Sequence, residues 1–186
     1  MRVFIAVDIN EHAIISSIRR IQDELTASHS SDLKPVELGN LHLTLKFLGE
    51  LDEKTVEAVM ERVRDIRYPR FRIRVKGLGY FPGGGRVNVI WAGVAEGVEQ
   101  LRGLYTLVED EMASLGFRRD RFSPHLTICR VKAVRNKGLL LSIISKQSEA
   151  DYGWQDVDSV KVKKSTLTPS GPIYEDLAVH MLGEAE

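Results

Sequence analysis

One pattern occurs twice in this chain of 186 residues and limits the folds that it can adopt. An apolar, β-branched segment is followed by a helical pattern, a loop and a second strand-like segment that contains His-x-Thr. Ile5 precedes His42 by 37 residues, and Ile90 precedes His125 by 35. Because no linker-like Pro or Ser stretch separates the copies, we expect a single domain over residues 1–186. The repeat predicts a duplicated α+β unit whose two lobes face each other about a pseudo-two-fold axis.

Hydrophobic periodicity places the elements along the chain. Apolar runs predict strands at residues 3–9, 41–48, 71–75, 87–94 and 126–131, and a hairpin formed by residues 157–167 and 173–182. Helical spacing of apolar residues predicts helices over 14–25, 56–63, 98–115 and 139–144. Residues 28–32 and 81–85 are expected to be loops, and residues 147–156 have no feature that indicates a role.

Charge and cysteine content narrow the class of protein. The chain carries 26 basic and 26 acidic residues, which argues against tight binding of long duplexes through many phosphates. A small pocket for one terminal phosphate remains compatible with this balance. The single cysteine, Cys129, excludes an internal disulfide and suits a reducing compartment. The first apolar run is too short for a signal peptide, and no run reaches the roughly 18 apolar residues of a membrane span. We expect a cytoplasmic protein with no membrane partner.

The two His-x-Thr segments present the same residue types on one face of a strand. Side chains alternate between the faces of a strand, so Leu43 and Leu126 are expected to point into the core. Alternation predicts two matching polar faces, one with His42, Thr44 and Lys46 and the other with His125, Thr127 and Cys129. A single short motif of this kind carries little weight. Two copies at equivalent points of a repeat favour one shared site.

Two imidazoles and two hydroxyls suit the in-line cleavage of a phosphodiester. Histidine titrates near neutral pH, so one ring can accept a proton while the other donates one. The hydroxyls of Thr44 and Thr127 can donate hydrogen bonds to the equatorial oxygens of the phosphate. A catalytic zinc site requires three protein ligands. Beyond the two histidines only Cys129 lies near in the pattern, so we expect no metal.

The residues around both motifs resemble the two-histidine phosphoesterase superfamily, and most closely its bacterial and archaeal RNA 2′,3′-cyclic phosphodiesterases, first called 2′-5′ RNA ligases. The resemblance covers nearly the whole chain. Its most specific stretches are RVFIAV from Arg2, GNLHLTLKFLG from Gly39, Phe81-Pro82 with the segment 86–94, and SPHLTICR from Ser123. It implies an α+β fold in which two antiparallel-rich sheets face a central cleft and the helices pack outside.

The resemblance also implies roles for individual residues. His42 corresponds to the proton donor and His125 to the proton acceptor that activates water, while Thr44 and Thr127 correspond to phosphate-binding residues. The symmetry of the site leaves open which histidine is the acid and which is the base. A basic residue that follows the second motif in the family corresponds to Arg130, which alternation places on the core face. Arg130 therefore reaches the phosphate only if its strand bends or ends.

The expected reaction is hydrolysis of an RNA 2′,3′-cyclic phosphate end to a 2′-phosphomonoester, without a cofactor. RNA 2′-5′ ligation by the reverse chemistry and a non-catalytic RNA- or nucleotide-binding module are the alternatives. Phe81, beside a glycine-rich loop, is a candidate for stacking a base, with core packing as the other interpretation. We expect a monomer whose partners are RNA ends or nucleotides.

Overall fold

The computed structural model describes residues 1–184 and has the predicted α+β fold. This part of the chain contains four α-helices, which are α1 (His12–Ala27), α2 (Glu53–Arg64), α3 (Val98–Ser114) and α4 (Lys137–Lys146). Its nine strands are β1 (Arg2–Asp8), β2 (Ser31–Pro35), β3 (His42–Glu50), β4 (Phe71–Gly83), β5 (Arg86–Val94), β6 (Leu126–Val134), β7 (Asp151–Val157), β8 (Ser159–Thr168) and β9 (Gly171–Met181). A 3-10 helix, Leu38–Asn40, leads into β3.

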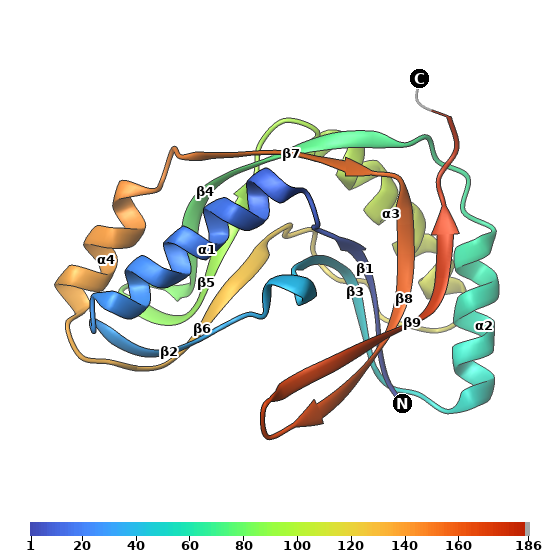
Figure 1. The fold of residues 1–186 in the computed structure, drawn as a ribbon. Coiled ribbons are helices and arrows are strands. Elements are labelled where there is room, and N and C mark those ends of the chain that lie inside the picture. Colours follow the sequence, from blue (N-terminus) through green and yellow to red (C-terminus); the bar gives the residue numbers. More distant parts are fainter. Residues whose placement is uncertain (185–186) are drawn as a thin grey trace.

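The strands pair in the order β7-β4-β5-β6-β3-β1-β8-β9, and β2 lies outside this order and pairs with β6. One lobe contains β2 and β4 to β7, and the other contains β1, β3, β8 and β9 (Figure 1). Within residues 1–184 the strands of the two lobes are joined by a single residue pair, Leu43 with Leu126, between β3 and β6. The two expected sheets are thus continuous as one nine-stranded sheet, and all of its strand pairings are antiparallel.

Helices α1 and α3 each pack against strands of the lobe opposite to the strand that they follow in the chain (Figure 1). Helix α1 follows β1 along the chain but packs against β2, β6 and β7 of the other lobe. Helix α3 follows β5 but packs against β3 and α2, in the lobe of β1, and also contacts β4. Helix α4 contacts β4, and α2 contacts β8 and β9. Each of the two repeats seen in the sequence is therefore distributed over both lobes.

The helices bury the faces that their periodicity predicts. In α1 the buried apolar residues are Ile14, Ile18, Ile21 and Leu25, and in α3 they are Leu101, Leu104, Tyr105, Val108 and Met112. Each fully buried Ile or Leu side chain contributes roughly 1.5–3 kcal/mol relative to exposure. One core cluster contains residues from both lobes, so the lobes share their hydrophobic stabilisation. None of the helices in residues 1–184 is both long and apolar enough to span a membrane.

Three segments differ from the sequence-based predictions. Strand β2 includes part of the predicted loop 28–32, and β7 lies in the segment 147–156 that gave no signal. Both are short strands with polar residues and a single partner strand, since β7 ends the strand order beside β4 and β2 pairs with β6 alone. In β7, the buried Gln155 accepts hydrogen bonds from the backbone N–H groups of Asn10 and Glu11, each at 2.9 Å. Strand β4 also continues to Gly83, into the predicted loop 81–85.

Candidate active site

The two His-x-Thr motifs meet where the lobes join. The paired Leu43 and Leu126 are the central residues of the motifs, and both are buried. Because the pairing is antiparallel, His42 lies on the Thr127 side of this pair and Thr44 on the His125 side. The pairing of β3 with β6 therefore brings together the four residues that the sequence singled out.

A β-bulge follows each motif. In the β1–β3 pairing, Ile5 is opposite Lys46 and Ala6 is opposite Thr44, which leaves Leu45 as the extra residue. In the β5–β6 pairing, Ile90 is opposite Cys129 and Trp91 is opposite Thr127, which leaves Ile128 as the extra residue. An extra residue changes which side chains share a face further along the strand. The bulges occupy equivalent positions, directly after Thr44 and Thr127.

The bulges correct three sequence-based expectations. Lys46 does not share the polar face with His42, because it lies beyond the bulge and is buried. Cys129 is likewise fully buried rather than beside His125, and its burial raises the pKa of the thiol to about 12. Arg130 turns outward instead of into the core, and its side chain is exposed. The sequence placed Arg130 near the phosphate only if its strand bends, and the bulge at Ile128 provides this bend.

Both histidine rings are anchored through the same nitrogen. Nδ1 of His42 lies 2.8 Å from the carbonyl oxygen of Asn40, and Nδ1 of His125 lies 2.7 Å from that of Ser123. A carbonyl oxygen only accepts hydrogen bonds, so Nδ1 carries the proton in each ring. Nε2 is then the nitrogen that can accept or donate a proton at a substrate. In each motif the anchoring carbonyl belongs to the residue two places before the histidine.

Aromatic side chains of two strands enclose the His42 ring. Its centroid lies 5.1 Å from that of Phe4 on β1 and 5.3 Å from that of Tyr174 on β9, with the tyrosine edge-on. Phe4 and Tyr174 also contact each other at 5.1 Å. This packing restricts the orientation of the ring and excludes part of the solvent around it.

His125 has an equivalent aromatic neighbourhood. The ring of Phe81 stands perpendicular to it at 5.0 Å, and Trp91 lies 5.2 Å from Phe81. The Trp91 ring occupies the space beside Gly79, where a Cβ atom would lie 2.3 Å from two of its carbons. Phe81 is half-buried, so its ring supports His125 while leaving part of its surface accessible. Its predicted role in base stacking stays a prediction.

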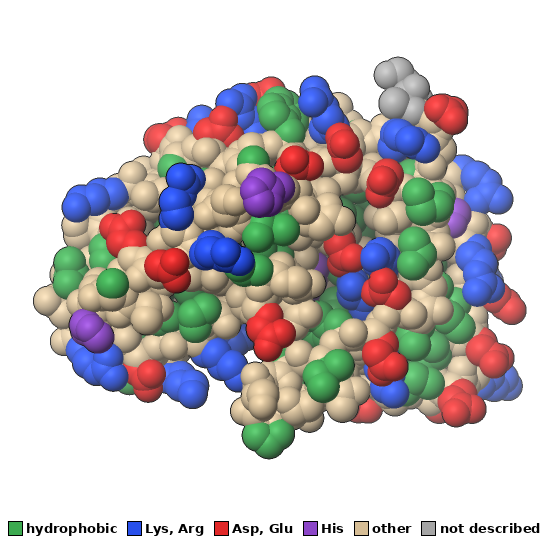
Figure 2. All heavy atoms as spheres, viewed as in Figure 1, with side chains coloured by type: hydrophobic (Ala, Val, Ile, Leu, Met, Phe, Trp, Pro, Cys, Tyr) green, Lys and Arg blue, Asp and Glu red, His purple; other side chains and the backbone are tan. Residues whose placement is uncertain are grey.

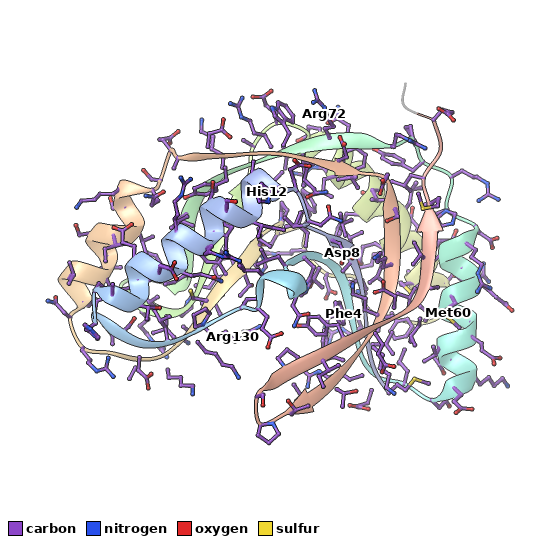
Figure 3. The ribbon with its side chains drawn as sticks, viewed as in Figure 1. Phe4, Asp8, His12, Met60, Arg72 and Arg130 are labelled. Carbon is purple, nitrogen blue, oxygen red and sulfur yellow. The ribbon has the colours of Figure 1, made fainter. Side chains whose placement is uncertain are left out.

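Charged groups on both sides of His42 act on its pKa. Burial has the largest effect and lowers the pKa, while the hydrogen bond to the Asn40 carbonyl raises it. The positive charges of Lys163 and Arg130 lower the pKa further, and Asp8 raises it. In Figure 3, Phe4 and Asp8 mark the β1 side of this region and Arg130 marks the β6 side. Arg130 therefore acts at the site from the opposite lobe.

Each segment that leads into a motif is held by a buried polar side chain of a helix. Gln22 of α1 donates hydrogen bonds from Nε2 to the carbonyls of Val36 at 2.9 Å and of Ile128 at 3.0 Å. Val36 comes before His42 in the chain, and Ile128 is the bulged residue after Thr127. One helix thus fixes the approach to the first histidine against the strand of the second.

The approach to His125 is held by a matching arrangement. Glu109 of α3 accepts a hydrogen bond from the backbone N–H of Asp120 at 3.0 Å and pairs with Lys46 at 3.1 Å. Lys46 also pairs with the Asp120 carboxylate at 2.7 Å and donates to the carbonyl of Arg118. The strand that carries His42 is therefore tied to the segment that leads to His125.

Metal-ligating side chains do not cluster in the part of the chain that the structure describes. Among residues 1–184, no three His, Cys, Asp or Glu side chains are placed so that they could hold an ion together. The two imidazoles with their neighbouring hydroxyls are thus the candidate chemical groups of the site.

Comparison with known proteins connects this arrangement to a family. Residues 7–91 and 93–174 match the model of a family described as LigT like Phosphoesterase, and each range contains one of the two motifs. The chain belongs to the LigT-like phosphoesterases. The resemblance drawn from the motifs is thereby confirmed.

Curated relatives of this LigT-like phosphoesterase match over most of its length. A protein of Archaeoglobus fulgidus named RNA 2′,3′-cyclic phosphodiesterase is 41% identical over 180 residues, which are 96% of this chain and 99% of the relative. A protein of the same name from Aeropyrum pernix is 37% identical over 166 residues, which are 88% and 94% of the two chains.

Solved structures share the whole fold. A crystal structure of a Thermus thermophilus protein superposes with a TM-score of 0.82 at 28% identity and covers 100% of both chains. The structure of Escherichia coli LigT complexed with 3′-AMP superposes with a TM-score of 0.75 at 25% identity and covers 98% of both chains. The architecture of the LigT-like phosphoesterases thus extends from end to end of this chain.

Sequence reasoning missed several groups that surround His42 in this LigT-like phosphoesterase. Tyr174 lies in the C-terminal hairpin, 132 residues from His42, and contacts the ring through tertiary packing. Lys163 and Asp8 act on the same ring and pair with each other at 3.0 Å. None of the three stands in a local motif, and it is the pairing of β1 with β3 and β8, and of β8 with β9, that places them at the site.

Proposed function

We propose that this chain hydrolyses RNA 2′,3′-cyclic phosphate ends to 2′-phosphomonoesters, without a metal ion. The observation that carries the proposal is the pair of imidazoles anchored at the junction of β3 and β6 with Nε2 left for the substrate. The name RNA 2′,3′-cyclic phosphodiesterase, which the curated relatives bear, supports the substrate. The 3′-AMP bound by E. coli LigT supports a nucleotide at this kind of site.

In the proposed reaction, Nε2 of His125 takes a proton from water as the water oxygen attacks phosphorus. The bond between phosphorus and the 3′ oxygen breaks, and Nε2–H of His42 gives its proton to that leaving oxygen. The products are a 3′-hydroxyl and a 2′-phosphate. Each such proton transfer typically contributes about 10²–10⁴-fold to the rate. The Nδ1 anchors support these roles, because they hold both rings in the tautomer that presents Nε2.

Thr44, Thr127 and Arg130 are proposed to bind the phosphate. The two hydroxyls stand beside the histidines across the β3–β6 junction, where they can donate to the equatorial oxygens. Arg130 adds a fixed positive charge, and a guanidinium suits an oxyanion because its donors are planar and paired. Its effect on the pKa of His42 supports its position near the phosphate.

The electrostatics of His42 bear on the choice of acid. Its lowered pKa favours the neutral ring in the free protein, whereas a proton donor must be charged. A bound cyclic phosphate carries a negative charge, and an anion within about 4–6 Å stabilises an imidazolium. Substrate binding therefore favours the protonated form of His42. The exchanged assignment, with His125 as the acid, is the alternative that the free-state pKa favours.

A substrate with sulfur in place of the bridging 3′ oxygen separates these assignments, because a thiolate leaves without needing a proton. We expect His42→Ala to keep turnover of the sulfur substrate and His125→Ala to lose it. The opposite pattern would exchange the two roles. If each variant lost as much turnover with the sulfur substrate as with the ordinary oxygen substrate, a division into acid and base would be contradicted.

The function itself is tested with a short RNA that ends in a 2′,3′-cyclic phosphate, in excess EDTA, with the 2′- and 3′-phosphate products separated. Formation of a 2′-phosphate is expected. Turnover that requires added zinc or manganese would contradict the metal-free reaction. Turnover that appears only when an RNA with a 5′-hydroxyl is added would point to ligation, and binding without either reaction would point to a binding module.

We also propose that the protein works as a monomer in the cytoplasm. The single cysteine, Cys129, supports a reducing compartment, because the chain uses no internal disulfide for its stability. Sedimentation at several protein concentrations tests the oligomeric state, and a mass that increases with concentration would contradict a monomer.

A further inference from the structure

The two sides of the His42 ring differ in charge. On one side of His42 lies Asp8, which is directly opposite it in the β1–β3 register. On the other side lies Arg130, which also acts on His42 but comes from β6. An RNA chain can leave the site toward Asp8 or toward Arg130. Because its phosphates are negative, the difference in charge can determine which direction it takes.

The Arg130 end is basic. Arg130 is directly opposite Lys34 of β2, which places the two side chains on the same face of the sheet, and Lys132 follows on β6. All three are exposed, and none forms an ion pair within residues 1–184. Asp32 comes earlier on β2, beyond a register shift between Asp32 and Leu33. In Figure 2, blue side chains lie along the lower edge of this lobe, where it faces the protruding β8–β9 hairpin.

The tip of the hairpin reaches this basic surface. Nδ2 of Asn40 donates to the carbonyl of Pro172 at 3.4 Å, and Nζ of Lys34 lies 3.2 Å from the position that a Cβ atom of Gly171 would occupy. Leu167 is directly opposite Pro172, and Tyr174, beside His42, lies on the same face two residues later. Leu167 is 67% exposed, so an apolar surface for a base stands next to the cations.

The Asp8 end is acidic. A pocket of about 380 Å³ opens there, and its lining includes four carboxylates but only one lysine. These residues are Asp8, Glu11, Asp156, Asp158 and Lys161. The lysine is already neutralised, because Nζ of Lys161 lies 2.7 Å from Asp8 and 2.9 Å from Asp176. No charged group of this lining is an unpaired cation, and the carboxylates of Glu11, Asp156 and Asp158 repel a phosphate.

Two arginines of β4 already have partners. Arg74 on β4 pairs with Glu96 and Asp151, and Arg72 stacks on the ring of Trp154 at 4.7 Å. By contrast, Lys34, Arg130 and Lys132 on β2 and β6 have no ion pair within residues 1–184 and are available to a polyanion.

We infer that the RNA chain on the 5′ side of the terminal nucleotide leaves the site over Arg130, Lys34 and Lys132, along the tip of the β8–β9 hairpin, and not through the acidic pocket. This inference rests on the proposed function. The terminal cyclic phosphate lies at the histidines, the next phosphates contact the β2–β6 cations, and a base lies on Leu167 and Pro172. Such a combination of backbone charges and an apolar platform suits single strands without regard to their sequence.

The test compares a mononucleoside 2′,3′-cyclic phosphate with a ten-nucleotide RNA that has the same 3′ end. Lys34→Gln and Lys34→Gln/Lys132→Gln remove charge from the inferred path without touching the histidines. Lys54→Gln, on the exposed face of α2, is the matched control. Asp156→Asn removes a carboxylate from the acidic pocket.

For the ten-nucleotide RNA, Lys34→Gln is expected to raise KM about 3- to 10-fold, and the double variant more, with KM for the mononucleotide unchanged. The dependence of log KM on log salt for the RNA should fall by about 0.7 per lost contact. Lys54→Gln and Asp156→Asn should leave both substrates unaffected. Equal effects on the two substrates, or a lower KM for the RNA in Asp156→Asn alone, would overturn the path. If the unmodified protein turned over neither substrate, the proposed function would fail together with this inference.

Discussion

The ammonium group of Lys46 lies 3.1 Å from the carboxylate of Glu109, and each of the two residues is only 3% exposed. Lys46 stands on the strand of His42, and Glu109 holds the segment that leads to His125. A buried ion pair of this kind is costly to break from one side, because the remaining charge has no partner.

Lys46→Met is therefore expected to lower the free energy of unfolding by about 3–5 kcal/mol. The double variant Lys46→Met/Glu109→Gln should recover much of this loss, because the amide keeps an acceptor for Asp120 and carries no charge. Guanidinium denaturation measures both, with the exposed Lys54→Met as the control. A single variant as stable as the unmodified protein would show that the pair is not a structural tie between the two motifs.

Replacing either histidine of the pair should abolish most of the turnover. His42→Ala and His125→Ala are each expected to lower kcat by about 10²–10⁴-fold, since each removes one proton transfer. His12→Ala, at the exposed start of α1, should leave kcat unchanged. Thermal unfolding of all three variants checks that the fold persists. Near-normal kcat in either motif variant would remove that histidine from the mechanism.

The threonine hydroxyls are expected to act mainly in the transition state. Thr44→Val and Thr127→Val keep the shape of the side chain and remove the donor, at a cost of roughly 2–4 kcal/mol in kcat/KM by analogy with a lost oxyanion donor. Thr106→Val on α3, whose hydroxyl donates to the Arg102 carbonyl, serves as the control. Steady-state kinetics on the cyclic phosphate decide the matter, and an unchanged kcat/KM in both motif variants would rule out the role.

The titration of His42 should differ from that of an ordinary histidine. Burial, the main cause, and the charges of Lys163 and Arg130 lower its pKa below 6.5 in the free protein. NMR titration of the ring should show a midpoint below this value. Arg130→Gln is expected to raise the midpoint, because it removes a positive charge, whereas Arg64→Gln on α2 should not move it. A midpoint unaffected by Arg130→Gln would place that guanidinium away from the site.

The same shift links pH to stability. Because the folded state binds a proton at His42 less readily than the unfolded chain does, the unfolded state holds more protons once the pH falls below about 6.5. The free energy of unfolding should therefore decrease as the pH is lowered through this range. His42→Gln should remove this part of the decrease. Urea denaturation at several pH values measures the difference, and parallel curves for the two proteins would contradict it.

The alternation of side chains on a strand predicted the histidines and threonines of the site and failed one or two residues later. His42 and Thr44 share a face as expected, but Lys46 is buried because Leu45 is an extra residue in the pairing with β1. Arg130 and Cys129 exchange faces for the same reason at Ile128. A bulge depends on the register with a neighbouring strand, so the sequence of one strand does not reveal it.

Helical periodicity likewise predicted which face of α1 is buried, but not which strands that face packs against. The positions of Ile14 and Ile18 indicate that one face is covered, whereas the identity of the covering strands depends on how the lobes assemble. Tyr174 reaches His42 in the same way, through the pairing of β9 with β8 and of β8 with β1. Local patterns thus predicted the elements and the candidate residues, and long-range pairing determined which side chains surround them.

The crossed helices make the two halves of the chain depend on each other. Helix α1 belongs to the first half but packs against β2, β6 and β7, and α3 belongs to the second half but packs against β3 and α2. Separating the halves would therefore expose apolar surface on both sides, because one core cluster contains residues of both lobes. The junction of Leu43 with Leu126 thus lies within a body that neither half can complete alone.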